Sequence, residues 1–303
     1  MEKKEFKRLR KIYDFIGTKL MLSAIIGVCI LFFILFFFFL IKSLPIWQTH
    51  SISEIFFSSI WNPDRAQFGF YAIIIDTILV TGIALLIAIP ISVLSAIYIS
   101  EYAPKKLRNF FRPFIDVLAG VPSVVYGLCA FLFIVPITKD FIAPFFGIYS
   151  TGLCVFTAAI ILAVMVFPII ISLCVESFNA IPLSLKEASL SVGATKWETV
   201  KKVIFRASSS NILAAILLGF GRAFGETIAV AMVVGGANQI PASIFGPGQT
   251  LAALIASGLS EIISIPLFEA AFLTAAFILF LIVLLFNLLG VIVLRRARKR
   301  WSY

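Results

Sequence analysis

The chain has 303 residues, of which 61% are hydrophobic and only 13% charged, and its formal net charge is +10. Water-soluble domains do not combine so much apolar sequence with so little charge, so the composition excludes that class. The apolar residues come in blocks long enough to cross a hydrocarbon layer about 30 Å thick, which predicts an all-α, polytopic membrane protein.

Six apolar blocks follow one another along the chain, each near the length that a helix needs to cross a bilayer. A basic tail, 1–19, precedes the first block, which is longer than the apolar core of a signal peptide and is not followed by a cleavage site. A second basic tail, 295–303, follows the last block. The six spans predicted within the 20–294 transmembrane domain are 20–41, 71–99, 114–136, 152–175, 211–235 and 269–294.

Lysine and arginine are concentrated on one side of these spans. The two tails and the loops at 100–113 and 176–210 hold 21 of the 25 basic residues. Because basic loops are retained in the cytoplasm, we expect both termini and these loops to be cytoplasmic. The positive charge is therefore a topology signal, since no folded basic domain with base-stacking aromatics accompanies it to bind nucleic acid.

Glycine and proline interrupt two spans at membrane depth. Pro90 lies in the second span, and Gly120, Pro122 and Gly127 lie in the third. Broken or kinked helices are tolerated in a membrane where the freed carbonyl groups face protein or a water-filled cavity. These positions indicate either the wall of a path or simple kinks.

The remaining polar and sulfur-containing residues of the apolar blocks carry weaker signals. Asp76 and Asp116, near the ends of the second and third spans, are interpreted as interfacial carboxylates, with a place along a path through the membrane as the alternative for either. The single histidine, His50, has no partner at metal-ligand spacing. Four cysteines in apolar blocks are interpreted as small buried hydrophobic residues rather than metal ligands or disulfides: Cys29, Cys129, Cys154 and Cys174.

The fifth span contains both an arginine and a glutamate, Arg222 and Glu226. Each ionised side chain costs about 2.5–3.5 kcal/mol at the centre of a membrane helix. On a helical wheel the two residues are one turn apart, on the face that carries small residues. Gly221 and Gly225 form a small-xxx-small pattern, which lets a neighbouring helix approach this face closely. They can form a buried ion pair that holds the bundle together. Alternatively, the guanidinium presents a planar fork to an oxyanion, with Glu226 balancing its charge at rest.

The cytoplasmic segment 182–206 carries two helix-start signals. Ser184 and Glu187 form one capping-box pattern, Thr195 and Glu198 form another, and Gly193 between them is a helix stop. We expect two short helices joined by a sharp turn. The first is too short to be stable alone, so it either docks on a partner or lies on the lipid surface.

This segment resembles the EAA loop of the membrane subunits of ATP-binding-cassette importers. Glu187, Ala188, Ser189 and, after three residues, Gly193 match the Glu-Ala-Ala-x-x-x-Gly pattern, although Ser189 replaces an alanine and 203–206 lacks the family's Leu-Pro ending. The resemblance implies that these four residues belong to a coupling helix that sits in a groove of an ATPase subunit.

The resemblance extends over most of the chain from the second span onward, and it is to the C-type permease subunits of phosphate importers. The matching elements are YISEYAPKKLR (98–108), RPFIDVLAGVPSVVYGL (112–128), GRAFGETIAVAMVVGG (221–236) and IPASIFGPGQTLAALIAS (240–257). It implies a type I importer fold in a bacterial cytoplasmic membrane and a substrate path that includes Arg222, Gly225, Glu226 and Thr227.

The chain has no G-x-x-x-x-G-K-[ST] segment, so it lacks a P-loop for ATP. The resemblance implies partners that supply the missing parts: two ATPase subunits, a second permease subunit of A type, and an external phosphate-binding protein docking on the loops at 42–70 and 236–268. We expect no cofactor. Three alternatives stay open: a permease for sulfate, molybdate or phosphonate, an ATP-independent carrier or channel, and a membrane scaffold.

Overall fold

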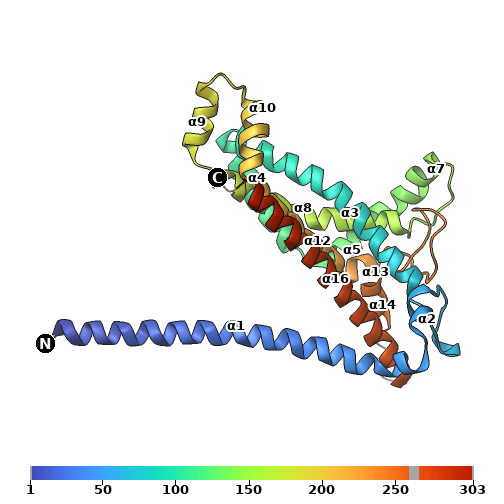
Figure 1. Cartoon of the computed structure of the whole chain (residues 1–303). Coiled ribbons are helices and arrows are strands. Elements are labelled where there is room, and N and C mark those ends of the chain that lie inside the picture. The colour runs from blue at the N-terminus through green and yellow to red at the C-terminus, as the bar shows by residue number, and fades with distance from the viewer. Residues whose placement is uncertain (1, 259–265, 302–303) are drawn as a thin grey trace.

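The computed structural model describes residues 2–258 and 266–301. Met1, residues 259–265 of the predicted external loop and residues 302–303 of the C-terminal tail lie outside the described residues. The described chain is mainly helical (Figure 1). Its sheet is a two-stranded antiparallel hairpin that pairs Trp61 with Phe68.

The first half of the chain contains the first three long helical runs. The run that starts with α3 and the run that starts with α5 contain π-helical turns, labelled η. In chain order the elements are α1 (Glu2–Thr49), α2 (Ile52–Phe57), β1 (Trp61–Asn62), η1 (Pro63–Arg65), β2 (Gln67–Phe68), α3 (Tyr71–Ile97), η2 (Tyr98–Tyr102), α4 (Lys105–Gly120), α5 (Ser123–Cys129), η3 (Ala130–Ile134), α6 (Val135–Ile137), η4 (Thr138–Ile142) and α7 (Ala143–Phe145), of which η1 is a 3₁₀ turn.

The second half begins with the most buried helix, α8. Its elements are α8 (Val155–Asn179), α9 (Leu183–Ser191), α10 (Lys196–Thr199), η5 (Val200–Ile204), α11 (Phe205–Ala207), α12 (Ser209–Gly225), α13 (Ile228–Ala231), α14 (Leu251–Ser257) and α16 (Pro266–Trp301).

Five helices in the described residues are long and apolar enough to cross a membrane, and a sixth is added if one bent pair counts as a single span. The bent pair joins Lys196–Ala207 to α12 at 70°. This agrees with the predicted all-α, polytopic class. The five helices are Tyr13–Thr49, Tyr71–Tyr102, Ser123–Phe145, Val155–Asn179 and Leu267–Arg296.

The third span differs from the predicted 114–136. Helix α4 ends at Gly120, Val121 is extended, and a new helical run starts at Ser123. Pro122 explains the break, because proline disfavours helical geometry in the residue before it and starts a helix well. Pro90, by contrast, stays inside α3.

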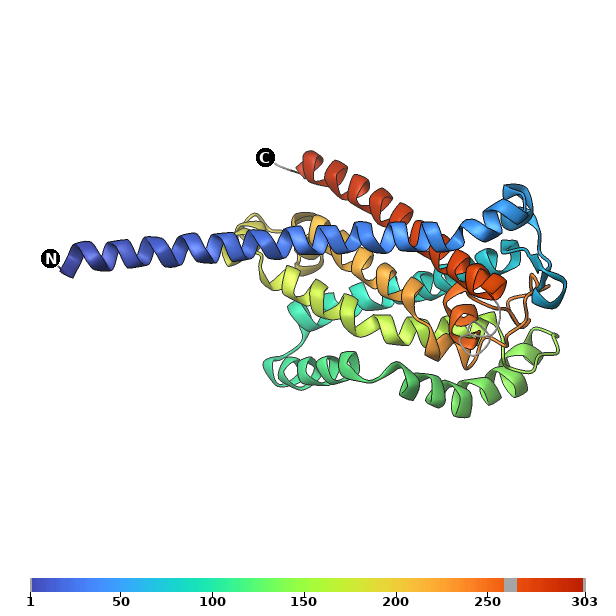
Figure 2. The ribbon, with the colours of Figure 1, turned by 90° about the horizontal axis from the view of Figure 1, so that it is seen from below.

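Helix α8 is the centre of the bundle and packs against α3, α12 and α4 (Figure 2). Its buried side chains form the main hydrophobic core together with inward-facing residues of α3 and α12. The cysteines divide between core and surface: Cys154 and Cys174 are buried, but Cys29 and Cys129 are exposed, so the prediction that all four are buried was wrong for two of them.

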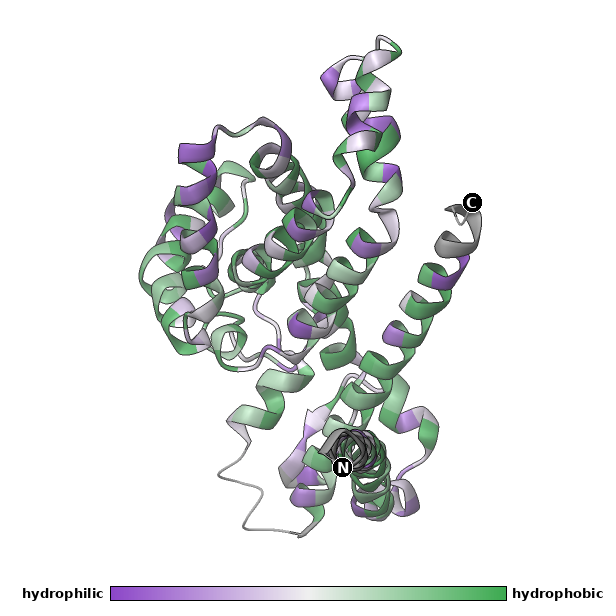
Figure 3. Ribbon diagram, turned by 90° about the vertical axis from the view of Figure 1, so that its left-hand side faces the viewer, coloured by the Kyte–Doolittle hydropathy of each residue, from purple (hydrophilic) through white to green (hydrophobic). Residues whose placement is uncertain are grey.

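Helix α1 packs on α16 near its C-terminal end, and its N-terminal half projects away from the bundle (Figures 1 and 2). The C-terminal part of α16 reaches the end of the bundle that carries α9 and α10, whereas α1 diverges from the bundle toward its N-terminus (Figure 1). Figure 3 shows hydrophilic residues gathered on the α9–α10 hairpin, whereas the bundle helices are mainly hydrophobic.

Candidate functional site

The predicted fifth span, 211–235, is not one continuous helix. Helix α12 stops at Gly225, and Glu226 is extended with φ −72° and ψ 127°. Two side chains satisfy backbone groups at this break: Glu226 Oε1 accepts from Ala229 N at 3.4 Å, and Thr227 Oγ1 donates to Gly225 O at 3.1 Å. Such local bonds compete with the helix, and glycine weakens it.

The break separates Glu226 from Arg222, so the predicted one-turn pairing on a common helix face was wrong. The ion pairs found among the described residues do not include these two. Arg222 Nε is buried and has no hydrogen-bond partner. Its guanidinium lies within electrostatic reach of Tyr126, whose hydroxyl donates to Leu118 O at 2.8 Å. The charged helix end therefore faces the break between α4 and α5.

The two glycine-bearing elements that the sequence singled out meet in space. Helix α13 packs against α5. A Cβ added at Gly127 would lie 2.7 Å from Met232 Sδ and 3.0 Å from Ala229 Cα, so the helices approach closely because this residue is a glycine. Two interrupted helices thus line one region of the bundle, which is the arrangement expected where freed carbonyl groups face a cavity or protein.

The glycines of α12 differ in whether a neighbouring helix packs against them. No described atom lies within 4 Å of a Cβ added at Gly221 or Gly225. The close approach occurs at Gly219 instead, where an added Cβ would lie 2.9 Å from Ile170 and 3.0 Å from Val166 of α8. The predicted small-xxx-small contact is therefore not made within the described chain, and that face stays open.

The face of α12 that carries Phe220 and Phe224 packs on α16. The rings of Phe220 and Phe224 lie 5.0 and 5.5 Å from that of Phe286. Leu217 fills the space over Gly290, where an added Cβ would approach within 2.0 Å. Helix α12 is thereby held between α8 and α16.

The segment 182–206, which we call the docking loop, turns sharply at Gly193 as predicted. Gly193 has φ +85°. Its N–H donates to Leu190 O at 3.0 Å, and the N–H of Ala194 donates to Ser189 O at 3.3 Å. This pair of bonds is the Schellman motif, in which a left-handed glycine satisfies the last carbonyl groups of a helix.

One of the two predicted capping boxes is present in the docking loop. Thr195 and Glu198 cap each other's backbone N–H groups at the start of α10. Ser184 and Glu187 do not, because α9 starts at Leu183 directly after Pro182 and its first residue makes no side-chain cap. Proline pre-sets the dihedral angles near a helix start, so the helix begins two residues before the position that the box requires.

The EAA-type residues of α9 are open to a partner. Glu187 and Ala188 are exposed, and Ser189 shares a hydrogen bond of 3.0 Å with Thr199 across the hairpin. No residue of α9 is buried. The large apolar side chains exposed on the hairpin are Leu183, Leu185, Leu190, Val192 and Trp197. Such a patch on an otherwise polar element is typical of a protein contact.

The two predicted interfacial carboxylates differ. Asp116 is exposed on α4, but Asp76 is fully buried, and its Oδ2 accepts from Gln249 N at 2.8 Å. The neighbouring Thr77 Oγ1 accepts from Leu251 N at 2.9 Å. Asp76 thus anchors the start of α14, a contact across 173 residues for which the local sequence carries no signal.

These features define a multi-pass helical membrane protein with interrupted helices beside a half-buried arginine, whose Nε is buried, and an exposed docking loop. A family model described as "Binding-protein-dependent transport system inner membrane component" matches residues 88–299. The probable phosphate transport system permease protein PstC of Methanocaldococcus jannaschii is 32% identical, over 98% of both chains. The phosphate transport system permease protein PstC of Xylella fastidiosa is 34% identical, over 81% of this chain and 79% of that protein.

A solved structure of the methionine ABC transporter MetNI in an inward-facing conformation has the same fold, with a TM-score of 0.59 over 78% of this chain and 99% of that chain at 17% sequence identity. That likeness concerns the fold alone. With the family match covering more than half of the sequence, the chain belongs to the family of inner membrane components of binding-protein-dependent transport systems.

Proposed function

We propose that this chain is a permease subunit that carries inorganic phosphate across the membrane in an ATP-driven importer. Two relatives at 32% and 34% identity are named as phosphate transport permeases. The observation that carries the proposal is the buried, unpartnered Nε of Arg222 beside two interrupted helices. A guanidinium is the side chain best suited to a tetrahedral oxyanion, because its planar fork can donate two parallel hydrogen bonds.

Four residues at the end of α12 are assigned to the substrate path. Arg222 binds the anion, and Gly225 lets the chain leave the helix without a side chain in the way. Thr227 donates to the carbonyl of Gly225 at the end of α12, and Glu226 accepts from the N–H of Ala229 at the start of α13, so the two side chains stabilise the two sides of the break. Because Glu226 is not paired with Arg222, the arginine is free to receive an anion without first breaking an ion pair.

The docking loop transmits to the membrane helices the movement that ATP hydrolysis produces in the partner subunits. Glu187, Ala188 and Ser189 form the contact surface of α9, and Gly193 fixes its angle to α10. We assign to the assembly two ATPase subunits, a second permease subunit of A type, which the open Gly221–Gly225 face suits, and an external phosphate-binding protein. The ATP sites lie in the partners, since this chain has no P-loop.

Both termini and the docking loop are assigned to the cytoplasmic side, on the strength of their lysine and arginine content. Ser191→Cys in the exposed docking loop should react with a membrane-impermeant maleimide in inside-out vesicles only, and Ser53→Cys on α2 in right-side-out vesicles only. The reverse pattern would contradict the orientation.

The function is tested by radiolabelled phosphate uptake into proteoliposomes that contain the whole complex and the binding protein. We expect uptake that requires ATP and that excess sulfate does not reduce. Sulfate uptake undiminished by excess phosphate would assign the chain to another oxyanion. Uptake of equal rate without ATP would identify an ATP-independent carrier instead.

A further inference from the structure

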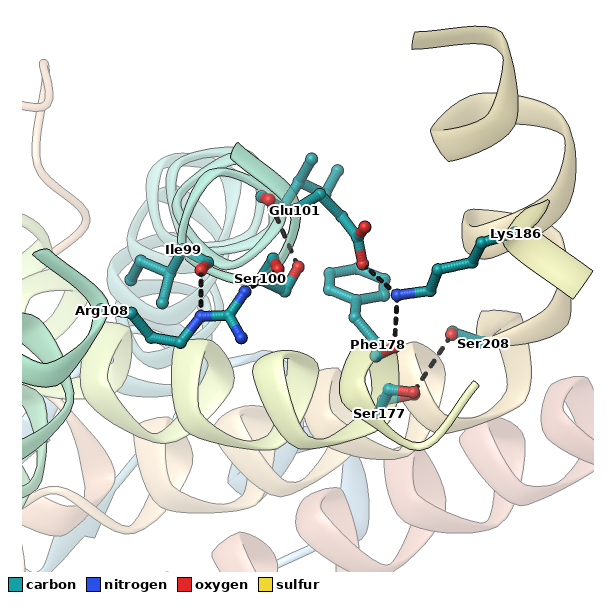
Figure 4. A network of polar contacts seen from close by, with 9 residues as sticks. Ile99, Ser100, Glu101, Arg108, Ser177, Phe178, Lys186 and Ser208 are labelled. Carbon is teal, nitrogen blue, oxygen red and sulfur yellow. Dashed lines mark hydrogen bonds and ion pairs between the residues drawn. The ribbon is translucent and has the colours of Figure 1, made fainter. Parts of the chain in front are cut away.

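Glu101 and Lys186 form an ion pair between the end of α3 and the docking helix α9. Lys186 Nζ lies 2.6 Å from Glu101 Oε1. The same ammonium group donates to Phe178 O at 3.5 Å, near the end of α8 (Figure 4). One side chain of α9 therefore contacts both the end of the α3 run, 85 residues earlier in the chain, and the end of the preceding helix α8.

This pair is shielded from water to an extent that the surface pairs are not. The side chains of Lys186 and Glu101 are 18% and 11% exposed, whereas those of Arg112 and Glu176, which join α4 to α8, are 61% and 63% exposed. Exposed pairs contribute little because water screens them. Removing one partner of a shielded pair instead leaves a charge that has lost both water and its counterion.

Helix α9 has few other connections to the bundle. It has no buried residue and packs mainly on α10 and η5 within its own hairpin. The side-chain hydrogen bonds of Ser189 and Ser191, to Thr199 and Ala188, also stay inside the docking loop. Among the described side-chain contacts of α9, those of Lys186 reach the membrane-spanning helices. The same hairpin makes one further contact with this end of the α3 run, where Lys196 Nζ of α10 lies 4.6 Å from the centre of the Tyr102 ring.

The segment that carries Glu101 is itself held in place. Arg108, at the start of α4, donates from Nε to Ile99 O at 3.1 Å and from Nη2 to Ser100 O (Figure 4). These carbonyl groups belong to the π-helical turn that ends the α3 run, where intrahelical donors run out. Glu101 therefore projects from a rigid end of the helix.

The α3 run reaches from the docking loop to the opposite end of the bundle (Figure 1). It is continuous from Tyr71 to Tyr102, 32 residues, or about 48 Å at 1.5 Å per residue. At its far end Asp76 and Thr77 bind the backbone N–H groups of Gln249 and Leu251.

The segment held by Asp76 continues the connection to the substrate path. Gly248 N donates to Val234 O at 2.9 Å, and Gly248 pairs with Gly235 in an isolated bridge. Val234 lies three residues beyond α13, the helix whose start Glu226 caps. A continuous set of contacts therefore joins α9 through α3 to the element that contains the break after Arg222.

The geometry points to the Glu101–Lys186 pair as the positioning contact that carries movement of the docking loop into α3, and through Asp76 and Thr77 to the loop at the far end. This inference rests on the proposed function, because it needs ATPase subunits that move the docking loop. The pair binds no substrate. Its role is to keep α9 and α3 moving as one body, so that ATP hydrolysis is converted into transport.

The test measures phosphate uptake and ATP hydrolysis in the same proteoliposomes of the complete complex, and reports phosphate moved per ATP hydrolysed. We expect Glu101→Gln and Lys186→Met to lower this ratio at least fivefold in complexes that copurify normally. The exchange variant Glu101→Lys with Lys186→Glu restores the pair and should recover at least half of the ratio. Arg112→Gln, which removes an exposed pair at the same end of the bundle, should leave the ratio unchanged.

The outcomes separate this inference from the proposed function. If the wild-type complex transports phosphate and the single variants have the same ratio of phosphate moved to ATP hydrolysed, the inference is overturned but the proposed function stands. An exchange variant that assembles but recovers nothing has the same consequence, because a purely local packing role explains that result. If the wild-type complex takes up no phosphate, the proposed function fails, and the inference falls with it. If Lys186→Met does not assemble, the nearly isosteric Glu101→Gln decides.

Discussion

Arg222 places a positive charge with an unsatisfied hydrogen-bond donor inside the helical bundle. It lies in the last turn of α12, beside the break, and its Nε is buried without a partner. An ionised side chain at the centre of a continuous membrane helix costs about 2.5–3.5 kcal/mol, so the break places Arg222 where this cost is smaller. An unsatisfied buried donor adds about 1–3 kcal/mol to this cost. Glu226 does not offset it, since its carboxylate instead accepts the Ala229 N–H. A site that holds a charged donor in this condition is suited to an anionic ligand that arrives and leaves.

The glycines of α12 give a prediction at this scale. Gly219→Val should lower the thermal stability of the solubilised chain, because its side chain meets Ile170 and Val166 of α8, and overpacking of this kind costs about 1–3 kcal/mol. Gly221→Val meets no described atom within 4 Å and should leave that stability unchanged, but should reduce copurification with the second permease subunit. Equal thermal shifts for the two variants would show that both faces pack within the chain.

At the scale of elements, local hydrogen bonds shape both the docking loop and the break after α12, but with opposite results. In the docking loop, the Schellman motif at Gly193 and the Thr195–Glu198 box complete two helix ends, so the hairpin has a fixed shape. At the break, Glu226 and Thr227 satisfy backbone groups in order to stop a helix inside the membrane-spanning bundle. Local hydrogen bonds by side chains decide both geometries.

Substitutions at Gly193 test the fixed angle of the hairpin. Gly193→Val forces a side chain into φ +85°, which costs about 1–2 kcal/mol for most residues, whereas asparagine adopts this conformation more readily. There is no steric clash, since nothing lies within 4 Å of an added Cβ. Gly193→Val should therefore lower ATP hydrolysis stimulated by the binding protein several-fold, and Gly193→Asn should keep most of it. Equal loss in both variants would assign the effect to contact rather than backbone geometry.

The capping box predicts a pH response of α10. Hydrogen bonding from the backbone N–H of Thr195, with the Lys202 ammonium next in effect, lowers the pKa of Glu198 from 4.5 to about 2. A carboxyl group whose pKa is lower in the folded than in the unfolded state stabilises the folded state at pH values above its unfolded pKa. The contribution of Glu198 is therefore complete above pH 4.5 and is lost as the pH falls toward 2.

Hydrogen exchange of residues 196–199, corrected for intrinsic rates, measures this response. Protection should fall between pH 4.5 and 2 in the wild type. Glu198→Gln still accepts the cap bond but does not titrate, so its protection should change less over that window. An identical pH profile for the two proteins would remove Glu198 as the cause.

At the scale of the whole molecule, helix α3 connects the docking loop to the far end of the bundle around the α8 core. Most of α1, and the C-terminal half of α16, expose large apolar side chains to their surroundings. A hydrocarbon layer accepts such a surface at no cost, since the helices satisfy their own backbone hydrogen bonds. The open face of α12 and the exposed hairpin are the surfaces that we propose for the protein partners.

Much of this could be predicted from sequence because its causes are local. Hydropathy predicted a polytopic helical membrane protein and its approximate spans. Gly193 predicted the sharp turn of the docking loop, and Thr195 with Glu198 predicted the capping box at the start of α10. The break after Gly225 could not be foreseen, because it depends on side chains that compete closely with a helix. The Glu101–Lys186 and Asp76–Gln249 contacts join residues 85 and 173 apart, and no local pattern encodes such a pairing.

The central claim is that Arg222 binds the anion in transit, and uptake by Arg222→Lys in the reconstituted complex tests it most directly. Lysine keeps the charge but loses the fork. The loss of one charge-assisted hydrogen bond, about 1.5–3 kcal/mol, corresponds to a decrease of about tenfold or more. We therefore expect a complex that assembles normally and takes up phosphate at a tenth of the wild-type rate or less, while Arg112→Lys, at an exposed arginine, transports normally. Wild-type uptake by Arg222→Lys would contradict the account and remove Arg222 from the substrate path.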